Sequence, residues 1–281
     1  MNIVLSTPQK AEQFAMLFQH VKAFTEHINI VFWPTYLYVQ CMDSAHVSIM
    51  EMTLPAHWFD KYAYTLGTSD STTVGLSSSV FYKILNSREK HQTIEIEYLV
   101  KDTDCLFVHM RSPCSTESAS GGAKEFEKHF EIPLIALESD AMEIPAFDHQ
   151  AEITISSYHF ANMISQLKMF GDTMELQCSE EKIMLVSHSP ENGKMFVEIK
   201  IDDVSCFLIE EGGDLSLAFS LGYLHNICLY HKIAKEVELK FSSEYPMQAT
   251  YFLSPSLESD GDDSSKRARI SFFLAPKINE E

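Results

Sequence analysis

The sequence predicts an α+β fold made of two similar domains, each with an antiparallel sheet covered on one face by two helices. Four segments of the first half recur in the same order in the second half, which indicates an internal duplication. The repeated segments show either the spacing of amphipathic helices or the period of two of half-buried strands. A stretch with no clear period separates the halves. We therefore expect domains at residues 1–133 and 151–281, joined by a linker at 134–150.

The first repeated pair predicts a helix in each half. Residues 14–24 (FAMLFQHVKAF) align with residues 160–170 (FANMISQLKMF), with Phe, Ala, Lys and Phe in step. In both segments the apolar residues recur at helical spacing: Phe14, Leu17, Phe18 and Val21, and Phe160, Met163, Ile164 and Leu167. Each helix should therefore bury one face against a flat partner such as a sheet.

The other repeated pairs predict strands and a second helix. Residues 37–41 (LYVQC) resemble 174–178 (MELQC), and residues 74–84 (VGLSSSVFYKI) match 217–227 (LAFSLGYLHNI). Ile94, Ile96 and Tyr98 alternate with polar residues as Val237, Leu239 and Phe241 do, which is typical of half-buried strands. Residues 112–124, rich in Ser and Gly, and the acidic residues 256–265 predict flexible loops.

The composition limits the classes of function. The chain has 281 residues, is 45% hydrophobic and has a net charge of -19. Coating DNA by counterion release needs an excess of Lys and Arg, so the charge argues against that mechanism, although basic groups gathered on one surface could still bind DNA. No apolar run is long enough for a membrane span and the start lacks a secretion signal, so we expect a soluble intracellular protein. The six cysteines form no CxxC pair, and we expect no metal and no cofactor.

The sequence contains no motif typical of an enzyme. Residues 211–214 (EGGD) predict a turn with no lysine after it, which is not a phosphate-binding loop. The twelve histidines include no HExxH motif, and no GxSxG motif occurs. We therefore expect no catalysis. A metal-dependent hydrolase that uses scattered His and Asp residues is the enzymatic alternative.

Two blocks of the sequence resemble a known family. Residues 42–49 (MDSAHVSI) and 272–278 (FFLAPKI), the latter followed by Glu280 and Glu281, are similar to blocks of the proliferating-cell nuclear antigen family of sliding clamps. Residues 59–62 (FDKY) and 170–172 (FGD) also fit this family. The resemblance implies two clamp domains per chain and a trimeric ring, with antiparallel sheets outside and paired helices inside. Topology then holds the ring on DNA, so a high positive charge is not required.

The resemblance also implies a function and a set of partners. A homotrimer would encircle double-stranded DNA without reading its sequence and would raise processivity by holding polymerase at a high effective concentration. The implied partners are DNA polymerase, a clamp loader and other clients with a short motif of one aliphatic and two aromatic side chains. We expect the protein in the nucleus, or at a viral replication site if its source is a virus. A subunit of a heterotrimeric checkpoint clamp is the closest alternative.

The resemblance places a peptide-binding socket on three parts of the chain. The socket would comprise Met42, His46, Val47 and Ile49, then Met142, Ile144 and Pro145 from the linker, and Pro246, Phe273, Ala275 and Pro276. A mostly apolar, methionine-rich surface bordered by one imidazole suits such a peptide. Without the resemblance, the apolar members of the first segment would be ordinary strand core and the histidine an ordinary surface residue.

The resemblance places a few cations on the helices that would face DNA: Lys22, Lys83 and Lys168, with Lys232 at the end of the fourth helix. Lysines there can follow phosphates without reading bases. Other positions where the family has cations are occupied by Ala15, Met16, Asn162, Ser165 and Leu229. We therefore expect a less positive inner wall than is usual in the family. The alternative is that the lysines are solvated helix charges unrelated to DNA.

The last surface implied by the resemblance is the seam between chains. It would join the segment of Phe130 and Ile132 to the segment of Met195, Phe196 and Val197 of the next chain. Unpaired edge strands favour such association, and head-to-tail pairing closes a ring when the rotation fits. Pro133 can donate no backbone hydrogen bond, so the ladder should end there. The alternative is a monomer or dimer with Phe130 packed internally.

Overall fold

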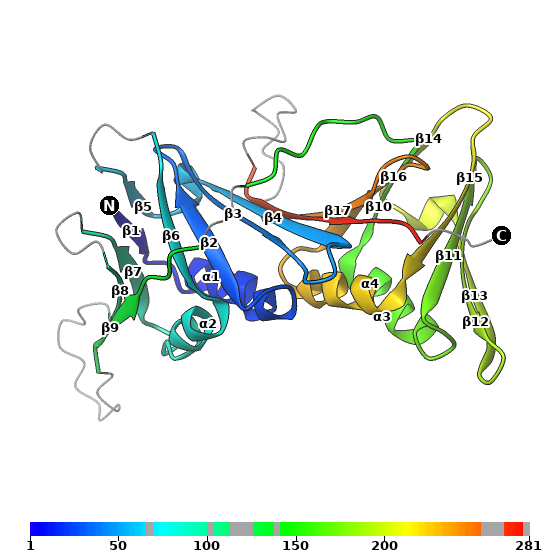
Figure 1. The fold of residues 1–281 in the computed structure, drawn as a ribbon. Helices are drawn as coiled ribbons and strands as arrows, with labels where there is room; N and C mark the ends of the chain where they lie inside the picture. Colours follow the sequence, from blue (N-terminus) through cyan, green and yellow to red (C-terminus); the bar gives the residue numbers. More distant parts are fainter. Residues whose placement is uncertain (66–69, 100–103, 113–125, 138–140, 254–266, 278–281) are drawn as a thin grey trace. The chain divides into compact units, whose positions relative to one another are not determined.

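The computed structural model describes residues 1–65, 70–99, 104–112, 126–137, 141–253 and 267–277. The chain forms two compact units (Figure 1). The first comprises Met1–Cys41, Met52–Ala141 and Ser264–Ala268, and the second comprises Met42–Glu51, Met142–Asp263 and Arg269–Glu281. Nearly all of the loop expected at 112–124, the loop expected at 256–265, and Ile278, Glu280 and Glu281 lie outside the described residues.

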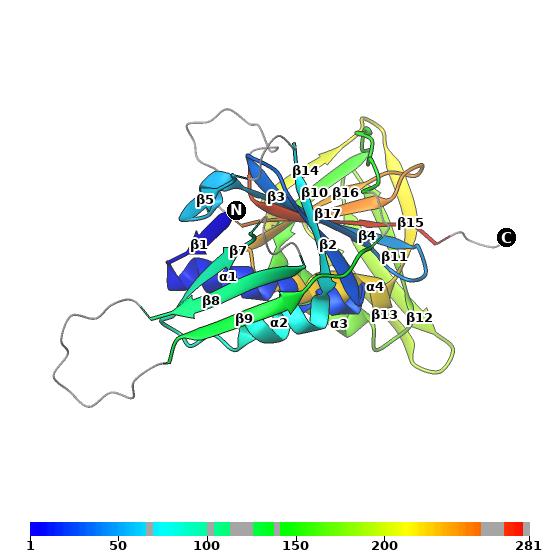
Figure 2. The ribbon, with the colours of Figure 1, turned by 60° about the vertical axis from the view of Figure 1, so that its left-hand side comes forward.

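The first half of the chain builds its sheets and helices in a fixed order. The order is β1 (Asn2–Leu5), α1 (Pro8–Gln19), the 3-10 turn η1 (Val21–Ala23), β2 (His27–Phe32), β3 (Tyr36–Met42), β4 (Ser48–Pro55), η2 (Ala56–Trp58), β5 (Lys61–Ala63), β6 (Thr72–Ser77), α2 (Ser78–Asn86), β7 (Thr93–Glu97), β8 (Cys105–Arg111) and β9 (Lys128–Pro133). In the first unit one sheet has the order β5-β1-β7-β8-β9, and β3-β2-β6 form another. Figure 2 shows α1 and α2 along one face of the sheet that contains β7, β8 and β9.

The second half repeats this order. It contains β10 (Ala151–Ser156), α3 (Ser157–Leu167), β11 (Thr173–Ser179), β12 (Ile183–Ser189), β13 (Gly193–Ile199), η3 (Ile201–Asp203), β14 (Cys206–Ile209), β15 (Asp214–Ser220), α4 (Leu221–Cys228), η4 (Leu229–Lys232), β16 (Glu236–Phe241), β17 (Met247–Phe252) and β18 (Arg269–Leu274). In the second unit the strand orders are β13-β12-β11-β15 and β14-β10-β16-β17-β18, and the start of β4 extends the latter beside β18.

The two halves match strand for strand. The order β5-β1-β7-β8-β9 becomes β14-β10-β16-β17-β18 when each strand is replaced by its counterpart nine strands later. This confirms the duplicated α+β fold. One alignment made from the sequence is wrong, because residues 37–41 lie in β3, whereas residues 174–178 lie in β11, the counterpart of β2. Neighbouring strands of a hairpin share the same apolar alternation, so the pattern alone cannot tell one from the other.

The helices bury the apolar face that the sequence predicts. In the first unit the rings of Phe14 and Phe18 lie 5.1 Å apart, and those of Phe18 and Phe81 lie 4.8 Å apart at 90°. All three side chains are fully buried. Edge-to-face contacts of this kind stabilise the core beyond the burial of their area. They connect α1 to α2 directly.

A buried serine ties the two helices of each unit together. The Ser78 hydroxyl, at the start of α2, donates to the Thr25 carbonyl just after η1 at 2.8 Å. The Ser157 hydroxyl, at the start of α3, donates to the carbonyls of His231 at 2.9 Å and Ala234 at 2.5 Å. The start of one helix is thus held beside the end of the other in both units.

The linker expected at 134–150 has no helix or strand among its described residues and is attached near both ends. Ile135 donates its backbone N–H to the Gly75 carbonyl of β6 at 2.8 Å. A Cβ on Gly75 would lie 2.2 Å from the Ile135 carbonyl oxygen, so this approach requires glycine. Near the other end, the Phe147 ring stacks on Tyr245 at 4.6 Å and 17°.

Candidate functional site

The turn between β3 and β4 is organised by one carboxylate. Asp43 is 7% exposed, and its Oδ1 accepts the backbone N–H groups of Val47 at 2.8 Å and Ser48 at 2.5 Å. Its Oδ2 accepts the Ala45 N–H at 2.9 Å and the hydroxyl of Tyr223, on α4, at 3.0 Å. A carboxylate on a short side chain that accepts hydrogen bonds from several backbone N–H groups strongly constrains a turn. The conformation of this turn therefore depends on Asp43.

These hydrogen bonds change the acidity of both partners. Burial opposes ionisation of Asp43, but hydrogen bonds from Ser48, Ala45, Tyr223 and Val47 outweigh it and hold the pKa below the usual value. Burial and the hydrogen bond to Asp43 raise the pKa of Tyr223. Asp43 is therefore ionised at neutral pH and Tyr223 is a neutral donor.

The turn holds His46 in an unusual backbone conformation. Its φ is 58°, the only positive φ of a non-glycine residue in the described part of the chain. Its N–H donates to the Asp43 carbonyl at 3.0 Å, and its side chain is exposed. The strain of this conformation is sustained by the hydrogen bonds on either side. The predicted socket histidine is thus displayed on a rigid turn.

The structure connects the other socket segments within the second unit. Ala275 donates its N–H to the Val47 carbonyl at 3.1 Å, which places the end of β18 beside the turn. In the β17–β18 ladder Phe273 pairs with Gln248, close to Pro246. The stack of Phe147 on Tyr245 brings the end of the linker to this same corner.

The exposures of the predicted socket residues suit a binding surface. Met142 is 47% exposed, His46 and Pro145 are exposed, and Phe273 is buried at 7%. The remaining members are half-buried: Met42, Val47, Ile49, Ile144, Pro246, Ala275 and Pro276. Partly exposed apolar side chains supported by a buried layer are what a peptide socket requires.

The four predicted DNA-facing lysines are all exposed, and none forms an ion pair with another residue that the structure describes. Lys83 lies on α2 and Lys168 caps the end of α3. One placement differs from the expectation. Lys22 follows α1 on η1, because the helix ends at Gln19, whereas Lys232 ends η4, which directly follows α4.

The two segments expected at the seam are edge strands of their sheets. β9 ends one sheet of the first unit, and β13 ends one sheet of the second. On β13, Phe196 is 66% exposed between half-buried Met195 and Val197. On β9, Phe130 is half-buried but Ile132 is 2% exposed. Ile132 is therefore a core residue, and only its backbone is available to a neighbouring chain.

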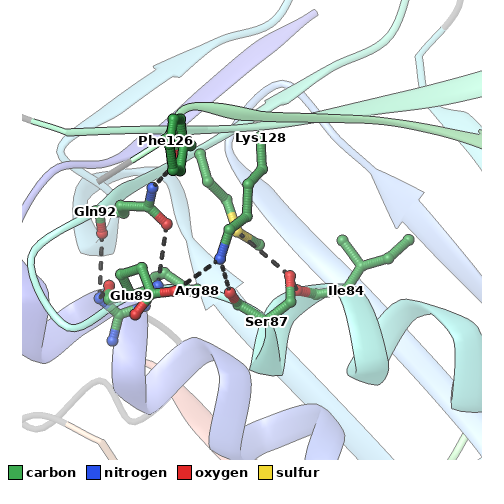
Figure 3. Close-up of polar contacts among 8 residues, drawn as sticks. Ile84, Ser87, Arg88, Glu89, Gln92, Phe126 and Lys128 are labelled. Carbon is green, nitrogen blue, oxygen red and sulfur yellow. Dashed lines mark hydrogen bonds and ion pairs between the residues drawn. The ribbon is translucent and has the colours of Figure 1, made fainter. Parts of the chain in front are cut away.

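A polar network that the sequence did not predict holds the start of β9 (Figure 3). The amide of Gln92, a residue only 1% exposed, donates to the Phe126 carbonyl at 2.7 Å and accepts the Glu89 N–H at 3.0 Å. The Lys128 ammonium donates to the Ser87 carbonyl at 2.5 Å and to the Glu89 carboxylate at 3.0 Å. These contacts fix the edge strand to the end of α2.

No helix in the described residues is long and apolar enough to cross a membrane. The described residues also contain no group of three or more His, Cys, Asp or Glu side chains arranged to hold a metal ion.

Comparisons with known proteins agree with this architecture. The family model described as "Proliferating cell nuclear antigen, C-terminal domain" matches residues 143–258. The chain is 26% identical over 271 residues to a probable DNA polymerase sliding clamp 2 of Paramecium bursaria Chlorella virus 1, covering 96% of this chain and 89% of the relative. It is 25% identical to proliferating cell nuclear antigen 2 of Drosophila melanogaster, covering 87% and 86%. A DNA polymerase sliding clamp of Thermococcus gammatolerans is 22% identical, covering 86% and 85%.

The chain is thus similar to the proliferating-cell nuclear antigen family of sliding clamps, through the family model over residues 143–258 and through relatives that align with most of its length.

The Asp43 contacts predict a pH-dependent loss of stability. Asp43→Asn keeps the size of the side chain but places an NH₂ group opposite the N–H and O–H donors that the carboxylate accepts. It should therefore lower the free energy of unfolding by about 2 kcal/mol at pH 7. Because the folded-state pKa is lowered, the carboxylate stabilises the fold above its unfolded pKa, and this contribution disappears as pH falls through the folded pKa. The difference between wild type and variant should therefore shrink below about pH 4. Urea unfolding of wild type and variant at pH 7 and pH 3 measures this difference in the free energy of unfolding.

The matched control is Ser44→Ala, at an exposed position of the same turn. It should leave stability unchanged at both pH values. An Asp43→Asn deficit that is the same at pH 7 and pH 3 would contradict the assigned role of the carboxylate.

Proposed function

We propose that this protein acts as a ring that encircles duplex DNA and tethers DNA polymerase to it. The observation that carries the proposal is the strand-for-strand duplication of one two-helix unit along the chain, in a protein similar to the sliding-clamp family. The named relatives favour this function over the checkpoint-clamp and hydrolase alternatives. Tethering requires no catalysis, and we propose none. The protein would work wherever DNA is replicated, in a nucleus or at a viral replication site.

The ring would be a homotrimer closed by pairing β9 of one chain with β13 of the next. Four edge strands of the described sheets, β5, β14, β6 and β15, are blunted. β5 has 3 residues and β14 has 4, which are short edges. Ile135 bonds to Gly75 of β6, and the Lys277 N–H bonds to Ala218 of β15 at 2.7 Å. β9 and β13, with 6 and 7 residues, remain the longer edges available for pairing.

The proposed seam predicts that a charge on β13 separates the chains. Phe196→Glu should convert a particle with the mass of three chains into single chains, because the carboxylate would be desolvated beside the neighbouring strand. The folded chain should tolerate it, since the side chain is 66% exposed. Leu208→Glu is the matched control, because Leu208 is 58% exposed on a different edge strand, β14. It should leave the trimer intact. Light scattering measures both masses. Equal dissociation by both variants, or by neither, contradicts this seam.

The contact with DNA would be weak and nonspecific. Lys22, Lys83, Lys168 and Lys232 offer few phosphate contacts, and the chain carries a net charge of -19. The exposed face of α3 presents neutral polar residues such as Asn162 instead of further cations. Retention on DNA would therefore come from closure of the ring.

This mechanism predicts that salt removes the protein only from DNA with open ends. On a duplex blocked at both ends, a loaded ring should persist in high salt, because escape requires a seam to open. On an open duplex it should leave quickly, since each phosphate contact weakens as counterions are added. Replacing Lys22, Lys83 and Lys168 together by Ala should lower the affinity for open DNA while retention on blocked DNA persists. Equally fast release of an intact trimer from both duplexes would exclude encirclement.

Client proteins would bind at the socket in the second unit. The turn anchored by Asp43, the end of β18 and the end of the linker meet there through the Ala275–Val47 bond and the Phe147–Tyr245 stack. Polymerase, clamp loader and other clients would insert an aliphatic and two aromatic side chains onto this surface. Apolar plugs of this kind gain most from desolvated pockets.

The socket predicts a separation of peptide binding from assembly. Ile144→Asp should reduce the affinity for a client peptide by at least tenfold, because it places a carboxylate where an apolar plug would sit. Ile135→Asp, near the other end of the linker, is the matched control: its side chain is 36% exposed and lies outside the socket. Fluorescence anisotropy measures the affinity and light scattering the mass. Unchanged peptide affinity in Ile144→Asp would overturn the socket assignment.

A further inference from the structure

Two histidines face each other on the outer face of the first unit's five-stranded sheet. His109 on β8 pairs directly with His129 on β9, and their Nδ1 atoms lie 2.8 Å apart. Both alternate with core residues such as Val108 and Ile132, so the rings lie on the face away from the core. Figure 2 shows β8 and β9 side by side. The register of the ladder fixes the two imidazoles as a pair.

The other ring nitrogens of the pair face carboxylates. His109 Nε2 lies 3.8 Å from a carboxylate oxygen of Glu97, on β7, and His129 Nε2 lies 3.8 Å from one of Glu127. These separations are longer than a hydrogen bond, so each carboxylate is an electrostatic neighbour of the outer nitrogen of its ring. Each ring is thus oriented with Nδ1 toward its partner.

His109 is packed against neighbouring side chains, whereas His129 is open to solvent. The side chain of His109 is 16% exposed, and its ring lies parallel to that of Phe107, with centroids 6.5 Å apart. The side chain of His129 is 55% exposed. The pair is accessible to solvent and to small ions from one side. The corresponding strands of the second half, β17 and β18, contain no histidine, so the duplicated fold does not require the pair.

We propose that His109 and His129 bind a divalent first-row transition cation such as Zn²⁺ through their two Nδ1 atoms. Imidazole nitrogen is a preferred ligand of these ions, with a bond of about 2.0–2.1 Å to zinc. Tetrahedral geometry requires the two nitrogens about 3.3 Å apart, so the rings need to open by only ~0.5 Å. Glu97 and Glu127 would remain as negative charges beside the outer ring nitrogens, and water would complete the coordination.

The site would be of modest affinity and would strengthen the sheet. Two protein ligands are fewer than the three or four of structural and catalytic zinc sites. A cation bound to the folded chain stabilises it by mass action. The cation would bridge β8 to the edge strand β9. The start of β9 is already held by Gln92 and Lys128.

The proposal is tested by titrating tag-free full-length protein with zinc chloride in a calorimeter. We expect one zinc per chain, and a loss of affinity of at least about tenfold in both His109→Ala and His129→Ala. Glu97→Gln should lower the affinity while both ligands remain, because it removes a negative charge beside the bound cation. His188→Ala is the matched control, because His188 is a single exposed imidazole 3.7 Å from Glu175 and should leave binding unchanged.

Three outcomes would overturn the proposal. The first is no zinc binding by wild type, which would leave the pair as an ordinary hydrogen bond between imidazoles. The second is equal affinity in wild type and both histidine variants, which would place zinc elsewhere. The third is a loss of zinc affinity in His188→Ala as large as the loss in His109→Ala and His129→Ala. Because the exposed His129 can be replaced with little effect on the core, circular dichroism of that variant separates loss of binding from loss of folding.

Discussion

Burial of an apolar helix face against a sheet is the constraint on which the rest of each unit depends. Phe14, Phe18 and Phe81 fill the space between α1, α2 and the strands, and Ser78 fixes where the helices meet. Once that face is buried, the opposite face must be polar. The lysines and amides on the outer helix faces are therefore where a duplex could lie, and their chemistry can vary without affecting the core. The polar residues of that face can therefore change without loss of the fold.

The sheets impose a second constraint, because an open antiparallel sheet always has two edges. Most edges in the described part of this chain are short or covered by the chain itself. The Gln92 amide and the Lys128 ammonium, in contrast, hold β9 in an extended and ordered form. An edge strand that is already fixed loses less conformational entropy when another strand pairs with it. The network near the end of α2 would thus favour the proposed pairing of β9 with a strand of another chain.

The sequence predicted the features that depend on local periodicity. The helices around Phe14 and Phe160 and the strands of Ile94 and Val237 were found because each buries a regularly spaced apolar set. Residues 37–41 were matched to the wrong strand because every hairpin strand of this fold alternates in the same way. The bond from Tyr223 to Asp43 joins residues 180 positions apart, and the buried Gln92 has no sequence signal, so neither could be predicted. The end of α1 before Lys22 was also missed, since the apolar spacing continues through Val21.

The two attachments of the linker have a consequence for how clients could bind. Ile135 is bonded to Gly75 and Phe147 is stacked on Tyr245, so eleven residues, 136–146, lie between the fixed points. Ordering the backbone of a residue costs about 1–2 kcal/mol, and closing a loop adds a cost that grows only slowly with its length. A segment tied at both ends has fewer accessible conformations than a free segment of the same length. If clients bind at the socket as proposed, less of their binding energy is spent on ordering the linker.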